Sequence, residues 1–229
     1  MKPKAPVAKQ QKIPEVGVYN ARLYKVVVLG TQTPKDPKYK PSFKVKLDFE
    51  LVDTNEVFDE AKGPQPFSMS LQETFSFHEK SNFRKHIESW IGVALTEAAM
   101  ASFDLKQYVG KAVQVVCQHK NGTKDPSIIY ANIANLLPAK RDANKKIIPI
   151  AKGRNPQIVF DMESLDSSLV NGKPTNTLEV FKLLNKWEQE MIESSPEWKQ
   201  LTSGIAVLAN NDAEEEIAEQ ELSEDEPPY

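Results

Sequence analysis

Residues 66–91 read PFSMSLQETFSFHEKSNFRKHIESWI, and the hydrophobic period changes within this stretch. Over residues 66–77 apolar and polar side chains alternate, which is typical of a half-buried strand. Over residues 81–91 the apolar positions instead follow the 3.6-residue period of an amphipathic helix. These positions are Phe83, Ile87 and Trp90. The stretch therefore predicts a strand that is followed closely by a helix.

Two further strands are expected before this stretch and two after it. Residues 18–29 (VYNARLYKVVVL) are β-branched and aromatic, and a bulge is expected near residues 26–28, where the alternation falters. Residues 42–52 (SFKVKLDFELV) alternate cleanly between apolar and polar. Residues 111–119 and 127–137 form the fourth and fifth expected strands.

Three strands, a helical insert and two more strands are the arrangement of the OB-fold, a five-stranded Greek-key barrel. A ferredoxin-like fold would need a helix after the first strand, where residues 30–41 are instead a proline-rich loop. An immunoglobulin-like sandwich would need about seven strands and no central helix. We therefore expect a mainly β protein with helices, whose OB-fold barrel covers residues 17–138 and has its helix between strands 3 and 4.

The remaining chain divides into three segments. Residues 1–16 are expected to be a flexible basic arm, residues 139–205 a basic linker with a C-terminal helical extension, and residues 206–229 a disordered acidic tail. Within the extension, residues 177–194 are expected to form one helix with Thr177 as its cap. That helix would present an apolar stripe of Val180, Leu184, Trp187 and Met191.

Charge is distributed unevenly along the chain. The formal net charge is −3, yet residues 1–46 carry 11 lysines and arginines against two acids. Residues 212–229 carry nine acids and no base. A basic body with a strongly acidic end suggests a polyanionic partner and an internal competitor for the same surface.

Several classes of protein and site are disfavoured by composition. The single cysteine, Cys117, excludes an intramolecular disulfide and a cysteine-cluster zinc site, and its place among strand valines indicates a buried thiol. No run of 18 apolar residues is present, and no apolar run follows the N-terminal Met1 to Lys4, so we expect a soluble intracellular protein. No glycine-rich phosphate loop or GxSxG motif occurs, and we expect no catalysis, no metal and no cofactor.

The candidate nucleic-acid interface consists of cations and tyrosines on the first two strands, their connecting loop and the start of the first helix. Cations that follow a groove hold phosphates, and exposed aromatic rings stack on bases. We expect Tyr24 and Tyr39 to stack. The full set is Arg22, Tyr24, Lys25, Lys35, Lys38, Tyr39, Lys40, Lys44, Lys46, Lys80, Arg84 and Lys85.

The last residues form a second candidate site, for partner proteins. An acidic stretch closed by proline and a terminal aromatic can screen a basic groove and can also dock into a basic-rimmed apolar pocket. The residues assigned to this site are Glu224, Asp225, Glu226, Pro228 and Tyr229.

Four segments resemble bacteriophage-encoded single-stranded DNA-binding proteins of the OB-fold class, over about residues 13–200. They are GVYNAR (17–22), LGTQ (29–32), FSFHEKSNFRK (75–85) and SPEW (195–198). The tail also resembles the tails of such proteins, although Tyr229 stands where phenylalanine is usual. The resemblance implies coating of single strands in phage DNA replication and recombination, in the cytoplasm of the bacterial host, and recruitment of replication proteins through the tail.

Other functions remain open at this stage. The same residue types suit an RNA-binding OB module. A protein-interaction adaptor, such as a replication or recombination mediator, would gain little DNA affinity when its tail is removed. A nuclease has no supporting motif in the sequence.

Overall fold

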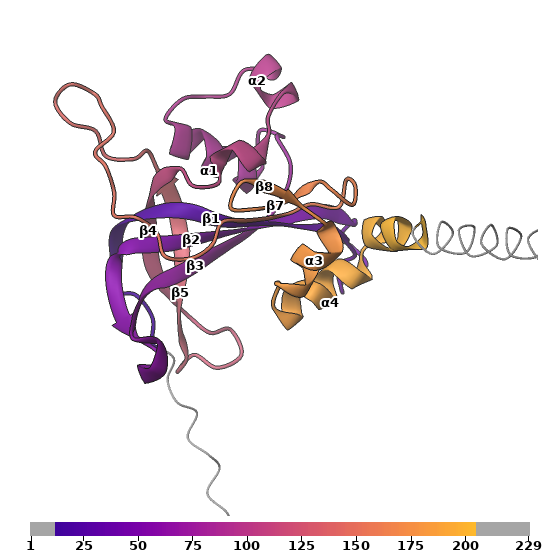
Figure 1. Cartoon of the computed structure of the whole chain (residues 1–229), viewed down its shortest axis with the longest axis horizontal. Coiled ribbons are helices and arrows are strands. Elements are labelled where there is room, and N and C mark those ends of the chain that lie inside the picture. Colours follow the sequence, from indigo (N-terminus) through magenta and orange to yellow (C-terminus); the bar gives the residue numbers. More distant parts are fainter. Residues whose placement is uncertain (1–11, 205–229) are drawn as a thin grey trace, which may run out of the picture.

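The computed structural model describes residues 12–204, which form a mainly β protein with short helices (Figure 1). Residues 196–204 are also helical. The elements are β1 (Gly17–Gln32), β2 (Ser42–Val57), the 3₁₀ helix η1 (Glu60–Lys62), β3 (Pro64–Thr74), α1 (Asn82–Ile91), α2 (Glu97–Ala101), the 3₁₀ helix η2 (Leu105–Tyr108), β4 (Ala112–Asn121), β5 (Ile129–Leu137), β6 (Ile158–Phe160), β7 (Ser168–Val170), β8 (Lys173–Thr175), α3 (Thr177–Lys182) and α4 (Lys186–Ser194).

The sheet branches at β1. One edge of β1 pairs antiparallel with β2, which in turn pairs with β3. The other edge pairs first with β4 over residues 17–22 and then, in parallel, with β6 over residues 25–27. From β4 the sheet continues to β5, and from β6 it continues to β7 and β8. β1 is therefore shared by two branches of one mixed sheet.

The expected succession of three strands, a helix and two strands is confirmed. The first branch has the order β3-β2-β1-β4-β5, and α1 packs against both β3 and β5. No ladder joins β3 to β5 within residues 12–204, so the sheet curves without closing. β3 and β5 still lie close to each other without pairing, and α1 contacts both strands.

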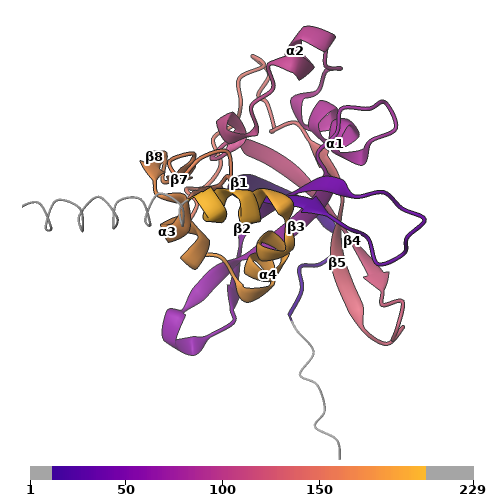
Figure 2. The ribbon, with the colours of Figure 1, turned by 90° about the vertical axis from the view of Figure 1, so that its right-hand side faces the viewer.

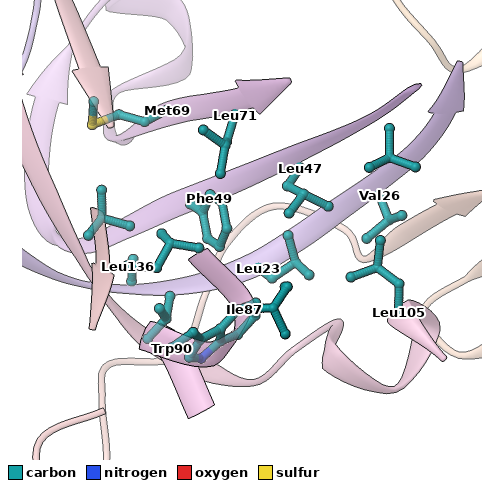
Figure 3. Close-up of a cluster of buried hydrophobic side chains, with 14 of the residues drawn as sticks. Leu23, Val26, Leu47, Phe49, Met69, Leu71, Ile87, Trp90, Leu105 and Leu136 are labelled. Carbon is teal, nitrogen blue, oxygen red and sulfur yellow. The ribbon is translucent and has the colours of Figure 1, made fainter. Parts of the chain in front are cut away.

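One hydrophobic core lies between the curved sheet and α1 (Figure 3). Phe49 from β2 meets Trp90 from α1 edge to face, with ring centroids 5.8 Å apart. The N–H of Trp90 is satisfied by the carbonyl of Ala112 at 3.0 Å. Cys117 is buried at the edge of this core, as expected, and burial raises the pKa of its thiol. α1 ends where Gly92 adopts a φ of 82°, which confirms the predicted helix over residues 81–91 to within one residue.

A second core lies on the opposite face of β1, beneath α3, α4 and the helix at residues 196–204. Val27 and Leu29 of β1 point into this core, whereas Val26 points into the first. Residues 26–28 are therefore apolar without alternation because both faces of the strand are covered. The bulges of β1 lie on either side, at residues 23–25 and 28–30.

Two expectations for the C-terminal extension are wrong. Residues 158–175 contain β6, β7 and β8, which were missed because strands of three residues are too short to show a period. Residues 177–194 form two helices, because Asn185 starts α4 with a capping box to Glu188. The N-cap of α3 is Asn176 and not Thr177, which is buried. Trp187 is 44% exposed and therefore does not continue the expected apolar stripe.

The close approach of the extension to β1 makes Gly30 a testable position. Gly30 has a φ of 72°, and an added Cβ would lie 2.7 Å from the Cβ of Ser195 and 2.8 Å from an oxygen of Glu197. We expect Gly30→Ala to combine the cost of a left-handed backbone, about 1–2 kcal/mol, with an overpacking cost of about 1–3 kcal/mol. Urea unfolding measures the loss of stability.

Gly172→Ala is the matched control. Gly172 has a φ of 76° but nothing within 4 Å of the added Cβ. It should therefore show the backbone cost alone. Equal losses in the two variants would contradict a tight contact between the extension and β1.

Candidate nucleic-acid interface

The lysines of the β1 and β2 face are internal to the protein. α4 lies against β1 (Figure 2) and places Glu188, which is fully buried, over this face. Lys25 pairs with Glu188 at 2.8 Å and with Asp48 at 2.9 Å, and Lys46 pairs with Glu188 at 2.7 Å. Lys46 also pairs with Asp48. We call these four residues the ion cluster; two positive and two negative charges balance within it.

The protonation of the ion cluster is fixed by its pairing. Burial alone would raise the pKa of Glu188, but hydrogen bonds from Lys25 and Lys46 outweigh it and hold the pKa below its usual value. Burial alone would lower the pKa of Lys25, but the charge of Asp48 and the hydrogen bond to Glu188 raise it. Both groups therefore stay charged at neutral pH despite their burial.

Arg22 is also buried, and its guanidinium is paired within the protein. Its Nε donates to Glu50 at 2.7 Å, and its guanidinium donates to the carbonyl of Asn155. Gly153 passes so close that a Cβ there would overlap the guanidinium of Arg22. The second oxygen of Glu50 accepts from the backbone N–H of Arg154 at 2.7 Å. Arg22 and Glu50 thereby tie the 139–156 segment to β1 and β2.

The expectation that Arg22, Lys25 and Lys46 lie on a solvent-facing strand surface is therefore wrong. The physical reason is that the C-terminal extension covers this face. Glu188 supplies a counter-charge for Lys25 and Lys46, and Glu50 of β2 pairs with Arg22. Tyr24 is half-buried on the same strand, and burial, with the nearby charge of Asp48, raises the pKa of its hydroxyl. Its ring is less accessible for stacking than the sequence indicated.

The β1–β2 loop, in contrast, presents its predicted residues to solvent. Lys35, Lys38 and Lys40 are exposed, and Tyr39 is 60% exposed. Nζ of Lys38 lies 4.9 Å from the centroid of the Tyr39 ring and 2.8 Å from a carboxylate oxygen of Asp36. Lys44 is half-buried at the beginning of β2. The loop thus combines an accessible aromatic ring with neighbouring ammonium groups.

The cations around α1 are only partly available. Lys80 and Lys85 are exposed. Arg84 donates from Nε to Glu88 at 2.9 Å and from a terminal nitrogen to the carbonyl of Phe77 at 3.1 Å. Arg84 therefore stabilises the start of α1, and the two lysines are the accessible part of this predicted patch.

The β4–β5 hairpin carries a hollow that the predicted set of residues did not include. A hollow of about 530 Å³ is lined by Lys120, Lys124, Ile128 and Tyr130, among others, and Tyr130 is 52% exposed. Tyr130 falls in the strand expected over residues 127–137, and the sequence alone does not show which face of that strand it occupies. Lys120, just before the turn, and Lys124, within it, were the available signal. The β1–β2 loop follows the Gln32 end of β1, whereas the hairpin extends beyond the Gly17 end, so the two lie at opposite ends of that strand.

The remaining predictions can be compared with the structure only over residues 12–204. The acidic tail site, Glu224 to Tyr229, lies outside them. Within them, no group of three or more His, Cys, Asp or Glu residues is arranged to hold a metal ion. No helix in this part of the chain is long and apolar enough to cross a membrane.

Comparison with known proteins does not assign this chain. No protein-family model matches the sequence, and no curated protein matches it either. The function must therefore be argued from the residues and their geometry.

The ion cluster generates a prediction about stability. Glu188→Gln leaves two buried ammonium groups with one carboxylate, and breaking a buried pair costs about 3–5 kcal/mol. Because the pKa of Glu188 is lowered in the folded protein, its contribution is complete above its unfolded pKa and disappears as the pH falls through the folded value. Urea unfolding at neutral and acidic pH should show this pH dependence in the wild type and a weaker one in the variant.

Glu190→Gln on the same helix is the control. Its side chain is 61% exposed and lies 3.8 Å from Lys186, a surface pair of little energetic consequence. A loss of stability equal to that of Glu188→Gln would show that the effect comes from α4 in general and not from the ion cluster.

Proposed function

We propose that this protein is a non-catalytic single-stranded DNA-binding protein with an OB-fold core. The strand order β3-β2-β1-β4-β5, with a helix between the third and fourth strands, supports an OB-fold that is open between β3 and β5. OB-folds bind oligonucleotides through the face of strands 2 and 3 and through the loops β1–β2 and β4–β5. Within residues 12–204, the two most exposed tyrosines lie on the first of these loops (Tyr39) and directly after the second, at the start of β5 (Tyr130).

The observation that carries the proposal is the pairing of an exposed tyrosine with lysines, once on the β1–β2 loop and once on the β4–β5 hairpin. Tyr39 lies beside Lys38, and Tyr130 lines the same hollow as Lys120 and Lys124. Stacking on such rings tolerates any base sequence, while the ammonium groups bind phosphates. The exposed outer face of β3, with Ser68, Ser70, Gln72 and Thr74, is polar and can accommodate a backbone between the loops.

The wider role follows from the resemblance to phage single-stranded DNA-binding proteins and from the charge pattern. In this proposal the protein coats exposed strands during phage DNA replication and recombination in the cytoplasm of the host. Its acidic tail, residues 212–229, competes with DNA for the cationic loops and recruits replication proteins through Tyr229.

Substitution of the tyrosines tests the stacking part of the proposal. Tyr39→Ala and Tyr130→Ala should each weaken binding to a fluorescent oligo-dT by about 1–3 kcal/mol, or roughly 5- to 150-fold. Trp187→Ala is the control, because Trp187 is an exposed aromatic on α4 and belongs to neither loop. Unchanged binding in both tyrosine variants would remove these loops from the interface.

The salt dependence tests the phosphate contacts. Replacing Lys35, Lys38 and Lys40 together by alanine should reduce the slope of log K against log salt by about 2, since each phosphate contact to a single strand contributes about 0.7. Lys25 and Lys46 are neutralised in the ion cluster and should contribute nothing to the slope. A slope unchanged by the triple substitution would contradict phosphate binding by the loop.

Truncation after Asn211 tests the tail. The truncated chain should bind oligo-dT more tightly than the full chain at about 50 mM salt, and the difference should narrow at about 200 mM because salt screens the competition. A parallel titration with oligo-U separates DNA from RNA preference. If neither the full nor the truncated chain binds oligo-dT, the result would contradict the proposal and favour a protein-interaction adaptor.

A further inference from the structure

A small exposed hairpin follows β5 and precedes β6. Residues 140–148, which we call the basic hairpin, project from the body at the upper left of Figure 1. Arg141 and Ile147 form an isolated antiparallel bridge, and the N–H of Ile148 donates to the carbonyl of Lys140 at 2.8 Å. All nine residues are exposed. The basic hairpin therefore has a defined backbone but contributes no side chain to either core.

The turn of the basic hairpin explains how it is ordered without packing. The N–H of Lys145 donates to the carbonyl of Asp142 at 3.0 Å. The carboxylate of Asp142 accepts from the N–H groups of Asn144 and Lys146, each at 2.9 Å. Lys145 has a φ of 62°, the left-handed conformation that follows the type I turn in three-residue hairpin loops. Glycine is the usual residue there, so lysine is accommodated at a conformational cost.

The charge of the basic hairpin is strongly positive. It holds four cations against the single acid Asp142, and these cations are Lys140, Arg141, Lys145 and Lys146. None of the three lysines takes part in an ion pair within residues 12–204. Arg141 donates from one terminal nitrogen to the carbonyl of Lys145 at 2.7 Å, which leaves its other N–H groups available. The hairpin therefore offers unpaired cations to a polyanion.

Two adjacent isoleucines lie among these cations. Ile147 is 51% exposed and Ile148 is 44% exposed. Residues that are opposite each other in an antiparallel pair share a face. Ile147 therefore lies beside Arg141 on one face, and Ile148 lies beside Lys140 on the other. Each face of the hairpin combines an accessible apolar side chain with a cation.

This combination fits the end of a DNA duplex better than a single strand. Single strands are bound by aromatic rings that stack on successive bases, and the basic hairpin has no aromatic residue. Isoleucine is instead among the apolar side chains that proteins insert between the base steps of a duplex, with lysines and arginines alongside. Where a duplex meets a single strand, the last base pair has a face that no further base pair covers. An apolar side chain can contact that face without separating two stacked pairs.

We propose that the basic hairpin binds the double-stranded end next to a single strand. Ile147 and Ile148 contact the last base pair, and the lysines contact the flanking phosphates. The inference rests on the proposed function only in taking DNA as the ligand. It adds a second site, because the basic hairpin follows the end of β5 whereas the β4–β5 turn precedes its start. The loops would hold the single strand of such a junction while the hairpin holds its duplex end.

Equilibrium binding to two fluorescent probes tests the isoleucines. One probe is a stem-loop duplex with a dT tail of about 15 nucleotides, and the other is the tail alone. The full wild-type chain should bind the tailed duplex at least about fivefold more tightly than the tail, since it buries apolar area and contacts additional phosphates there. Ile147→Ser combined with Ile148→Ser should remove most of this preference and leave binding to the tail unchanged. Leu183→Ser is the control, because Leu183 is 57% exposed at the end of α3 and lies outside the hairpin.

The salt dependence tests the lysines. Lys140→Ala, Lys145→Asn and Lys146→Ala together should reduce the slope of log K against log salt on the tailed duplex by about 2 to 3, since each duplex phosphate contact contributes about 0.9. Asparagine is used at position 145 because it tolerates a left-handed backbone. The slope measured on the tail alone should not change.

The two probes separate failure of this inference from failure of the proposed function. A wild-type chain that binds the tailed duplex no more tightly than the tail, or that binds neither probe, would overturn the inference. A preference that the isoleucine variant leaves intact would also overturn it, and would favour a protein partner for the basic hairpin. Hairpin-dependent binding to the tailed duplex without any binding to the tail alone would support the inference and contradict the proposed function.

Discussion

The partner exchange along β1 is the constraint on which the rest of this structure depends. The first six residues of the strand pair with β4, and after Arg22 the same edge turns to β6. A bulge at residues 23–25 lies at this transition, and the N–H of Gly110 donates to the carbonyl of Leu23 there at 2.7 Å. One strand thereby supports two cores on its two faces. The central valines of β1 are buried in both cores, Val26 in the first and Val27 in the second, so displacing β1 would open both cores.

The second core has an electrostatic consequence for function. Packing α4 over β1 and β2 removes Lys25 and Lys46 from water, and this desolvation is tolerated because Glu188 and Asp48 neutralise them in place. Cations that are paired in this way offer nothing to a phosphate. The accessible members of the predicted set lie instead on the β1–β2 loop and at the start of α1. The division between internal and accessible lysines therefore follows from where the extension packs.

The sequence predicted the parts of this fold that long periodic segments encode. The strands at 42–52 and 66–77 and the helix at 81–91 were recognised because each spans several periods of its pattern. The three-residue strands β6 to β8 carry no period, and the break at Asn185 depended on a capping box within an otherwise helical stripe. For the candidate site, the prediction that Lys25 and Lys46 face solvent was wrong because their partner Glu188 is 142 residues or more away in sequence. Asp48, which alternates with the lysines on the same strand, was the local indication of pairing.

The central claim is that the loops, and not the strand face under α4, contact a single strand of DNA. Hydrogen–deuterium exchange of the full chain with and without oligo-dT tests it most directly, because the two surfaces lie in different peptides. The account predicts slower exchange in the β1–β2 loop and in the β4–β5 hairpin, with α4 and the centre of β1 unchanged. Faster exchange of α4 on binding, together with unaltered loops, would contradict the account, since it would mean that the extension opens to release Lys25 and Lys46.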